Sequence, residues 1–230
     1  MTKAAAQIQA INKIAKVWPL FLKQVKPELT EKQVACLLWQ ILKQQGFAKK
    51  AFRFIVATGA SAAEPHHWPT NKKLIKGQAV KIDFGVTHRG WKTDITRTVF
   101  LDKPTNLQKK LYQLVFMAQQ QSAKLLKPGI PAQTIDSRAR SIIKRAGYGK
   151  YFIHSTGHGV GKQIHEPPWL SPTKKGLGKL KIGDVVTIEP GIYLPGRLGI
   201  RIEDMYLITK TGSRHLTGAI PRDLQSNILA

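Results

Sequence analysis

The chain has 230 residues, of which 42% are hydrophobic and 22% are charged. This composition supports a buried core and excludes wholesale disorder. The single cysteine, Cys36, excludes an internal disulfide framework and a cysteine-based zinc site. No stretch approaches the roughly 18 consecutive apolar residues of a membrane helix. We therefore expect no membrane contact and a protein of the reducing cytoplasm.

The net charge of +24 is unusually high. Such an excess favours contact with polyanions such as RNA or the ribosome. However, the lysines are dispersed in pairs, as at Lys49-Lys50 and Lys174-Lys175, and no recognisable motif for reading nucleic acid is present. A solvated basic surface therefore explains the charge at least as well as a weak polyanion contact does.

The expected elements alternate between helices and strands along the chain. We predict helices over residues 5–24 and 30–46, then strands over 52–58, 79–86 and 93–100, helices over 105–126 and 131–146, and strands over 185–190 and 203–209. The acid-poor N-terminus faintly resembles an organelle transit peptide. Its apolar residues fall at helical spacing, however, which favours the first helix of the domain.

The sequence repeats itself weakly. Lys26-Pro27 and Lys127-Pro128 each open a helical segment, at an offset of 127 − 26 = 101. Residues 77–86 match residues 183–192 at an offset of 183 − 77 = 106. Two equivalent halves can share a central site, and no linker separates them. We therefore expect residues 1–230 to form a single domain with internal pseudo-symmetry.

Four acids fall at matched positions of this repeat. Asp83 and Glu189 each follow an apolar strand, and Asp94 and Glu203 each begin the next one. A single such acid is best explained as salt-bridged in so basic a protein. Four in matched pairs are better explained by a metal, because buried carboxylates are costly unless paired or bound to a cation. An oxygen-rich cage of this kind suits manganese, cobalt, iron or zinc.

Three of the seven histidines lie within twelve residues, at His154, His158 and His165. Gly157 and Gly159 flank the middle one, so that its backbone can bend and nothing bulky crowds a ligand. A lone histidine is usually structural, but this cluster is better explained by a metal or proton-transfer site.

Three segments carry a family resemblance. VKIDFGVTHRGWKTDITRTVF, GHGVGKQIHEPP and TIEPGIYLPGRLGIRIED resemble the signatures of the pita-bread metallopeptidases, which include methionine aminopeptidases, Xaa-Pro aminopeptidases and prolidases. The resemblance spans residues 5–212. It implies an α+β pita-bread fold, with pseudo-two-fold α/β halves around a curved antiparallel sheet, and a metal-dependent aminopeptidase.

The resemblance also implies a metal centre with two divalent ions. Asp83 would hold one ion, His158 and Glu189 would hold the other, and Asp94 and Glu203 would bridge both. Manganese is the expected metal, with cobalt, zinc and iron as alternatives. The two ions would share a water or hydroxide that attacks the scissile carbonyl.

Further roles follow from the same resemblance. Glu189 would shuttle the proton, and His165 and His66 would polarise the carbonyl and stabilise the tetrahedral intermediate. We choose His66 over His67 because it directly follows a proline, as in the family. His154 resembles a histidine on the substrate side.

Arg201, two positions before Glu203, is similar to the pattern of Xaa-Pro aminopeptidases and prolidases, and methionine aminopeptidases typically lack it. It would anchor a substrate group or orient Glu203. We therefore predict cleavage of Xaa-Pro bonds in peptides. The catalytic domain begins almost at Met1, so we expect the separate N-terminal domain of typical Xaa-Pro enzymes to be lacking.

That compact size keeps a methionine aminopeptidase as the alternative. A non-catalytic pita-bread binding protein is a further alternative, which the intact ligand set disfavours. The sequence leaves the oligomeric state open.

Overall fold

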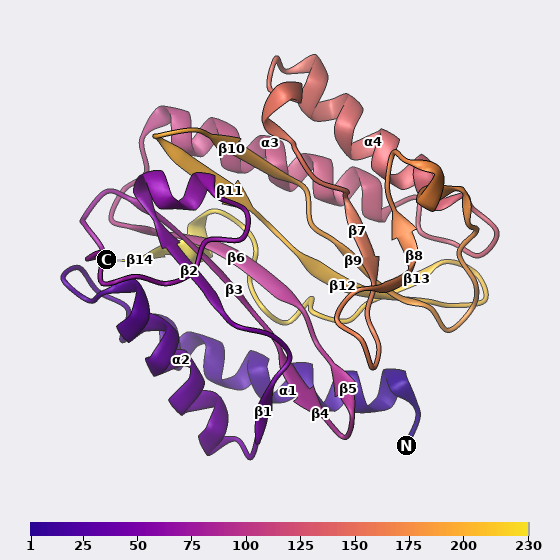
Figure 1. The fold of residues 1–230 in the computed structure, drawn as a ribbon, viewed down its shortest axis with the longest axis horizontal. Helices are drawn as coiled ribbons and strands as arrows, with labels where there is room; N and C mark the ends of the chain where they lie inside the picture. Colours follow the sequence, from indigo (N-terminus) through magenta and orange to yellow (C-terminus); the bar gives the residue numbers. More distant parts are fainter. Residues whose placement is uncertain (230) are drawn as a thin grey trace.

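Two helix pairs flank a set of largely antiparallel strands in the computed structural model, which describes residues 1–229 (Figure 1). The helices are α1 (Lys3–Leu22), α2 (Glu31–Gln44), α3 (Asn106–Ala123) and α4 (Ala132–Arg145). In Figure 1, α1 and α2 lie below the strands and α3 and α4 lie above them. All four lie within one to three residues of the predicted ranges.

The strands form two main sheets. One has the order β14 (Ile228–Leu229), β6 (Ile95–Leu101), β3 (Ala79–Phe84) and β2 (Ile55–Thr58). The other has the order β13 (Ser213–His215), β12 (Asp204–Ile208), β9 (Val185–Ile188), β7 (Gly157–Gly159) and β8 (Glu166–Leu170). Smaller pairings join β1 (Lys49–Lys50), β4 (Val86–His88) and β5 (Trp91–Lys92), and join β10 (Gly191–Leu194) to β11 (Leu198–Arg201).

Local sequence accounts for the start of two helices. Thr30 caps α2. Its hydroxyl accepts from the backbone N–H of Gln33, and the side-chain oxygen of Gln33 accepts from the backbone N–H of Thr30. Thr105 and Gln108 do the same for α3. Such capping boxes satisfy N–H groups that have no partner within the helix.

The internal repeat is visible in the backbone. An isolated bridge joins Thr30 to Lys73 in the first half, and another joins Pro131 to Lys179 in the second. The positions differ by 131 − 30 = 101 and 179 − 73 = 106, which are the offsets found in the sequence. The β3–β6 and β9–β12 hairpins are likewise equivalent, so the two halves place their acids in corresponding positions.

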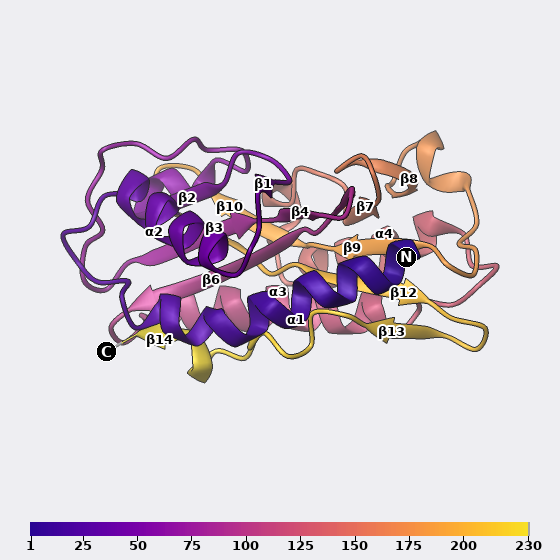
Figure 2. The ribbon, with the colours of Figure 1, turned by 90° about the horizontal axis from the view of Figure 1, so that it is seen from below.

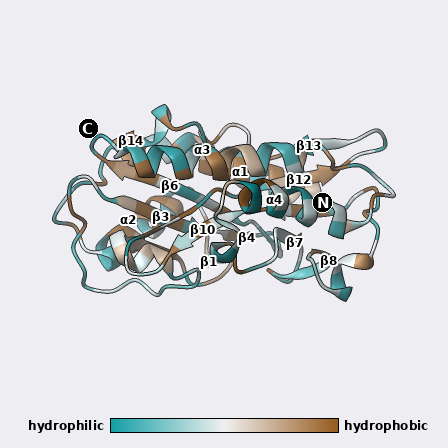
Figure 3. Cartoon of the chain, turned by 90° about the horizontal axis from the view of Figure 1, so that it is seen from above, coloured by the Kyte–Doolittle hydropathy of each residue, from teal (hydrophilic) through white to brown (hydrophobic). Residues whose placement is uncertain are grey.

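The hydrophobic core lies between the helices and the strands. Trp18 of α1 is 1% exposed and stacks on Phe84 of β3, with ring centroids 5.3 Å apart and an interplanar angle of 4°. Figure 2 shows α1 running along the flattened molecule beside the strands. The helices in Figure 3 carry both hydrophobic and hydrophilic residues, as expected of helices that cover a core on one face. None of the helices within residues 1–229 is long and apolar enough to cross a bilayer.

Strands β10 and β11 were not among the strands predicted from the sequence. Their residues follow Pro190 and surround Pro195 and Gly196, which indicate a turn rather than a strand. The predicted strand over 52–58 is also shorter in the structure, where β2 begins at Ile55. β10 and β11 pair with each other across this turn, whereas β2 pairs with β3, which lies further along the chain.

Replacing Trp18 by alanine should lower the free energy of unfolding by about 3–5 kcal/mol, because the change removes a fully buried ring. The measurement is chemical denaturation of the full chain. Leu20→Ala on the same helix is the control, because Leu20 is 55% exposed, and it should stay within about 0.5 kcal/mol of the wild type. Equal losses of unfolding free energy in the two variants would contradict the burial of Trp18 against Phe84.

Candidate active site

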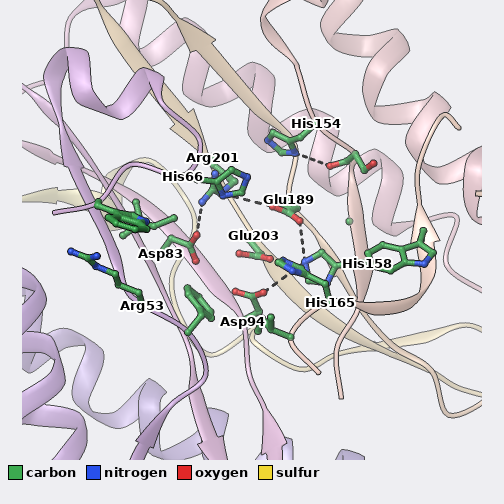
Figure 4. A pocket seen from close by; sticks show the side chains of 17 residues that line it. Arg53, His66, Asp83, Asp94, His154, His158, His165, Glu189, Arg201 and Glu203 are labelled. Atoms are coloured by element: carbon green, nitrogen blue, oxygen red, sulfur yellow. Dashed lines mark hydrogen bonds and ion pairs between the residues drawn. The ribbon is translucent and has the colours of Figure 1, made fainter. Parts of the chain in front are cut away.

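A cavity of about 500 Å³ opens between the two halves of the molecule and is lined by all nine side chains singled out in the sequence (Figure 4). They are Asp83, Asp94, His158, Glu189, Glu203, His66, His154, His165 and Arg201. No other described pocket contains this combination of acids and histidines. The structure therefore brings the predicted residues together, although they span more than half of the chain.

The acids come from ends of strands. Asp83 lies near the end of β3, Asp94 directly precedes β6, Glu189 directly follows β9, and Glu203 lies between β11 and β12. The backbone N–H of Glu203 donates to the carbonyl of Thr96 at 3.1 Å, which joins the two halves beside the site. Strand ends held in this way give the carboxylates fixed positions.

The ligand atoms form overlapping groups, each within 4.8 Å. One group is Asp83, Asp94 and Glu203, and another is His158, Glu189 and Glu203. A third contains Asp94, His158 and His165. Asp94 and Glu203, the residues that the family resemblance gives as bridging ligands, each belong to two groups. This geometry suits two cations with shared ligands.

Burial and mutual repulsion disfavour the charged forms of three of the acids. Burial raises the pKa of Asp94 and of Glu203 well above the usual range, and neighbouring carboxylates raise both further. Burial also raises the pKa of Asp83, against the opposing charge of Arg201. Asp83 Oδ1 is buried and has no hydrogen-bond partner within residues 1–229. Hard oxygen donors in this state fit divalent cations.

His158 is oriented toward the acids by its backbone contact. Its Nδ1 lies 3.0 Å from the carbonyl oxygen of Gly159 and donates to it, which leaves Nε2 facing the pocket. Nε2 lies 3.3 Å from Glu189 Oε1 and 3.7 Å from Asp94 Oδ2. Although burial opposes it, the pairing with Glu189 raises the pKa of His158 to about 9.

The glycines beside His158 have a different physical reason from the expected one. A Cβ on Gly157 would lie 2.1 Å from the carbonyl oxygen of Thr187, and one on Gly159 would lie 2.3 Å from that of Pro167. Neither glycine has a positive φ. They admit the close approach of neighbouring strands rather than a bend of the chain.

Arg201 is 2% exposed and connects several parts of the site. Its guanidinium donates to a carboxylate oxygen of Asp83, to the hydroxyl of Tyr193 at 2.9 Å and to Thr96 Oγ1 at 3.1 Å. Thr96 Oγ1 in turn donates to Glu203 Oε2 at 2.8 Å. Of the two roles expected for Arg201, the geometry favours orienting the ligands.

His154 is held as a neutral ring. Its Nδ1 donates to the carbonyl oxygen of Ser155 at 2.8 Å, and its Nε2 lies 2.7 Å from the hydroxyl of Tyr193. Burial lowers the pKa of His154 to about 4. Because both nitrogens are engaged within the protein, a direct substrate contact by His154 stays a prediction. Tyr193 was missed in the sequence, where a tyrosine in an apolar run indicates only a strand.

Of the two neighbouring histidines, His66 lines the pocket and His67 does not. His67 Nε2 lies 2.8 Å from Glu31 Oε2, and its Nδ1 lies 3.1 Å from Glu64 Oε2. His165 lies edge-on to His158, with ring centroids 4.4 Å apart.

The sequence also gave no sign of an apolar wall that lines the same pocket. This wall consists of Phe52, Ile55, Trp68 and Trp169.

The variant Asp94→Asn should have opposite effects with and without metal. In chelator, the raised pKa of Asp94 means that the folded protein holds extra protons, so wild-type stability falls as the pH rises above the carboxyl's ordinary value. Asparagine does not ionise, so the variant lacks this loss of stability and should melt at or above the wild-type temperature at neutral pH. With Mn²⁺ added, the wild type should gain stability, and the variant should gain much less.

The control for this experiment is Glu28→Gln, because Glu28 pairs with Lys73 on the surface. It should follow the wild type under both conditions. A metal-dependent gain in Asp94→Asn equal to that of the wild type would exclude Asp94 as a ligand.

Comparison with known proteins places the chain in a family. Residues 5–210 match the family described as "Metallopeptidase family M24". The Xaa-Pro dipeptidase of Pyrococcus furiosus is 41% identical over 219 residues, which cover 94% of this chain and 62% of that protein. The solved prolidase of Pyrococcus furiosus has a TM-score of 0.90 at 40% identity and covers 94% of this chain and 63% of its own. The X-Pro aminopeptidase of Thermotoga maritima has a TM-score of 0.92 at 36% identity, with 96% and 62% covered.

The chain thus spans less than two thirds of the length of these relatives. The similarity nevertheless runs through both halves of the repeat and all three signature segments, and it confirms the α+β pita-bread fold expected from the sequence. The chain belongs to metallopeptidase family M24, on its prolidase branch.

Proposed function

We propose that the chain is an aminopeptidase that uses two divalent metal ions to hydrolyse the bond after the N-terminal residue of peptides, at Xaa-Pro sequences. The observation that carries the proposal is the pair of ligand groups that share Glu203 in one pocket. The unpartnered Oδ1 of Asp83 and the raised pKa values of Asp94 and Glu203 support it.

Each side chain has a proposed task. Asp83, Asp94, His158, Glu189 and Glu203 would hold the metals, with manganese first and cobalt, zinc or iron as alternatives. Such ions, when bound, supply Lewis acidity and lower the pKa of water toward about 7. Glu189 would carry the proton from the attacking water to the leaving amine. His66 and His165 would donate to the oxygen of the scissile carbonyl.

The apolar wall supports a substrate with a proline ring. Phe52, Ile55, Trp68 and Trp169 line the pocket beside the acids. A compact apolar ring such as that of proline is well matched to aromatic and aliphatic side chains. The names of the relatives, Xaa-Pro dipeptidase and prolidase, point the same way. A methionine aminopeptidase is the alternative.

The remaining expectations from the sequence stay predictions. They are a cytoplasmic location, a weak contact with RNA or the ribosome from the charge of +24, and a single catalytic domain over residues 1–230.

The direct test is a peptide cleavage assay after metal reconstitution. We expect release of the first residue from Xaa-Pro peptides with Mn²⁺ or Co²⁺, and loss of that release in chelator. His158→Ala should abolish turnover while circular dichroism shows a retained fold, and Lys73→Met on the surface should not change it. Faster cleavage of Met-Ala and Met-Gly peptides would support the methionine alternative. Folded, metal-loaded protein without turnover on any of these would refute the proposal.

The two neighbouring histidines give a matched pair for the carbonyl-binding role. His66→Gln should lower kcat by about 100- to 1,000-fold, because it removes a donor to the developing oxyanion. His67→Gln should retain a kcat within about tenfold and should mainly lower the melting temperature, because His67 contacts buried Glu31. The measurements are steady-state kinetics and thermal unfolding of both variants. The reverse order of effects on kcat would assign the role to His67.

A further inference from the structure

Lys81 is a fully buried lysine on β3, the strand that also carries Asp83 of the candidate metal centre. It lies two residues before Asp83, so both side chains point to the same face of the strand. Lys81 does not line the pocket, and it forms no ion pair within residues 1–229. A buried lysine without a carboxylate partner is rare and needs another physical reason.

The side chain of Lys81 contacts carbonyl groups of one short segment. Its Nζ donates to the carbonyl oxygens of Ala62 at 3.0 Å, Glu64 at 2.6 Å and Pro65 at 3.4 Å. Ala62 belongs to the short helix η1 (Gly59–Ala63), and Pro65 directly precedes His66. Burial lowers the pKa of Lys81. The ammonium can donate to all three carbonyls, whereas the neutral amine has two N–H groups, which are enough for the two shorter contacts, to Ala62 and Glu64.

Other groups hold the same segment against the strands. The carbonyl oxygen of Pro65 also accepts from Arg201 Nη1 at 3.1 Å. A Cβ on Gly199 would lie 1.9 Å from the carbonyl oxygen of Ala62, so η1 rests directly on the backbone of β11. The backbone before His66 is therefore fixed by β3 on one side and β11 on the other.

The backbone after His66 is fixed separately. Glu31 Oε2 lies 2.8 Å from His67 Nε2 and accepts from the backbone N–H of Thr70 at 2.9 Å. The ring of His66 itself has no hydrogen bond to any residue within 1–229, and it faces the pocket (Figure 4). The chain on both sides is held rigidly, and the ring between is left available for a ligand.

We propose that Lys81 is a positioning residue, which fixes the carbonyls of Ala62, Glu64 and Pro65 and thereby sets His66 at the substrate side of the metal centre. This inference rests on the proposed function, in which His66 contacts the substrate. Rigid support matters because a displacement of about 1 Å at a catalytic group can cost on the order of 100-fold in rate.

The test is a double-mutant cycle in the full-length, Mn²⁺-loaded protein. Lys81→Met keeps an unbranched chain and removes the donors, and it should lower kcat by about 10- to 100-fold with a smaller change in KM. In the His66→Ala background, the same substitution should cause no further loss, because Lys81 acts through His66. An equal fold-loss in both backgrounds would overturn the proposal, because it would show that Lys81 supports the fold or the metals instead.

A second variant guards against a folding defect. Lys81→Gln retains N–H donors in place of the amine and should recover a substantial part of the activity lost in Lys81→Met. Equal losses in the two variants would contradict a role for the donors. Lys73→Met, a surface lysine that is 63% exposed at its side chain, is the control and should match the wild type.

Histidine ring NMR gives a readout that does not depend on turnover. The signals of His66 and His67 can be assigned with His66→Ala and His67→Gln. In Lys81→Met the His66 signal should shift or broaden. The His67 signal should be unchanged, because the contact between the His67 ring and Glu31 does not involve Lys81. An unchanged His66 signal, or equal changes at both rings, would overturn the positioning role. Absence of turnover in the wild type would refute the proposed peptidase function alone.

Discussion

Four carboxylates are concentrated in one buried pocket, and the architecture around them is arranged to hold this negative charge in place. Asp94 and Glu203 lie within ligand distance of other acids and have raised pKa values because of burial and mutual repulsion. Side chains on flexible loops would move apart. Here the acids sit at strand ends, and the buried guanidinium of Arg97 donates to the backbone carbonyls of Thr96 and Glu203 and pairs with Asp204. The same burial and repulsion favour the binding of a cation by this cluster of carboxylates.

Arg201 joins the acids of the pocket, the segment before His66 and His154 into one network. It contacts Asp83 among the acids, the carbonyl of Pro65 beside His66, and the hydroxyl of Tyr193, which in turn meets His154. An unpaired polar atom in a buried network of this kind is costly, and within residues 1–229 Asp83 Oδ1 has no hydrogen-bond partner. His154 is held neutral by burial, with its Nδ1 proton directed to Ser155. A change at Arg201 would therefore alter several groups at once, and single-residue effects in this region should not be additive.

The acids and the helices could be predicted from the sequence because the signals for both are local. A strand followed by an acid, repeated at an offset of 106 residues, places Asp83 and Glu189 in equivalent positions without knowledge of the fold. The roles of Tyr193 and Lys81 could not be predicted in this way, since their partners lie on other segments, as with Lys81 and the carbonyl of Ala62. The reason for glycine at position 157 could not be predicted either, because it depends on the close approach of the Thr187 carbonyl from another strand. These roles depend on contacts between segments that lie far apart in the sequence, whereas β10 and β11 pair with each other across a short turn.

The apolar wall beside the acids has two physical consequences that act together. Phe52, Ile55, Trp68 and Trp169 add apolar surface to the lining of the pocket, and apolar surroundings lower the effective dielectric around the carboxylates. A lower dielectric strengthens both the repulsion among the acids and their attraction to a cation. Under the proposed function, the same side chains would contact the apolar part of a substrate. A substrate bound against them would displace water from the pocket and strengthen the charge interactions at the scissile bond, so substrate fit and electrostatic activation would depend on one set of side chains.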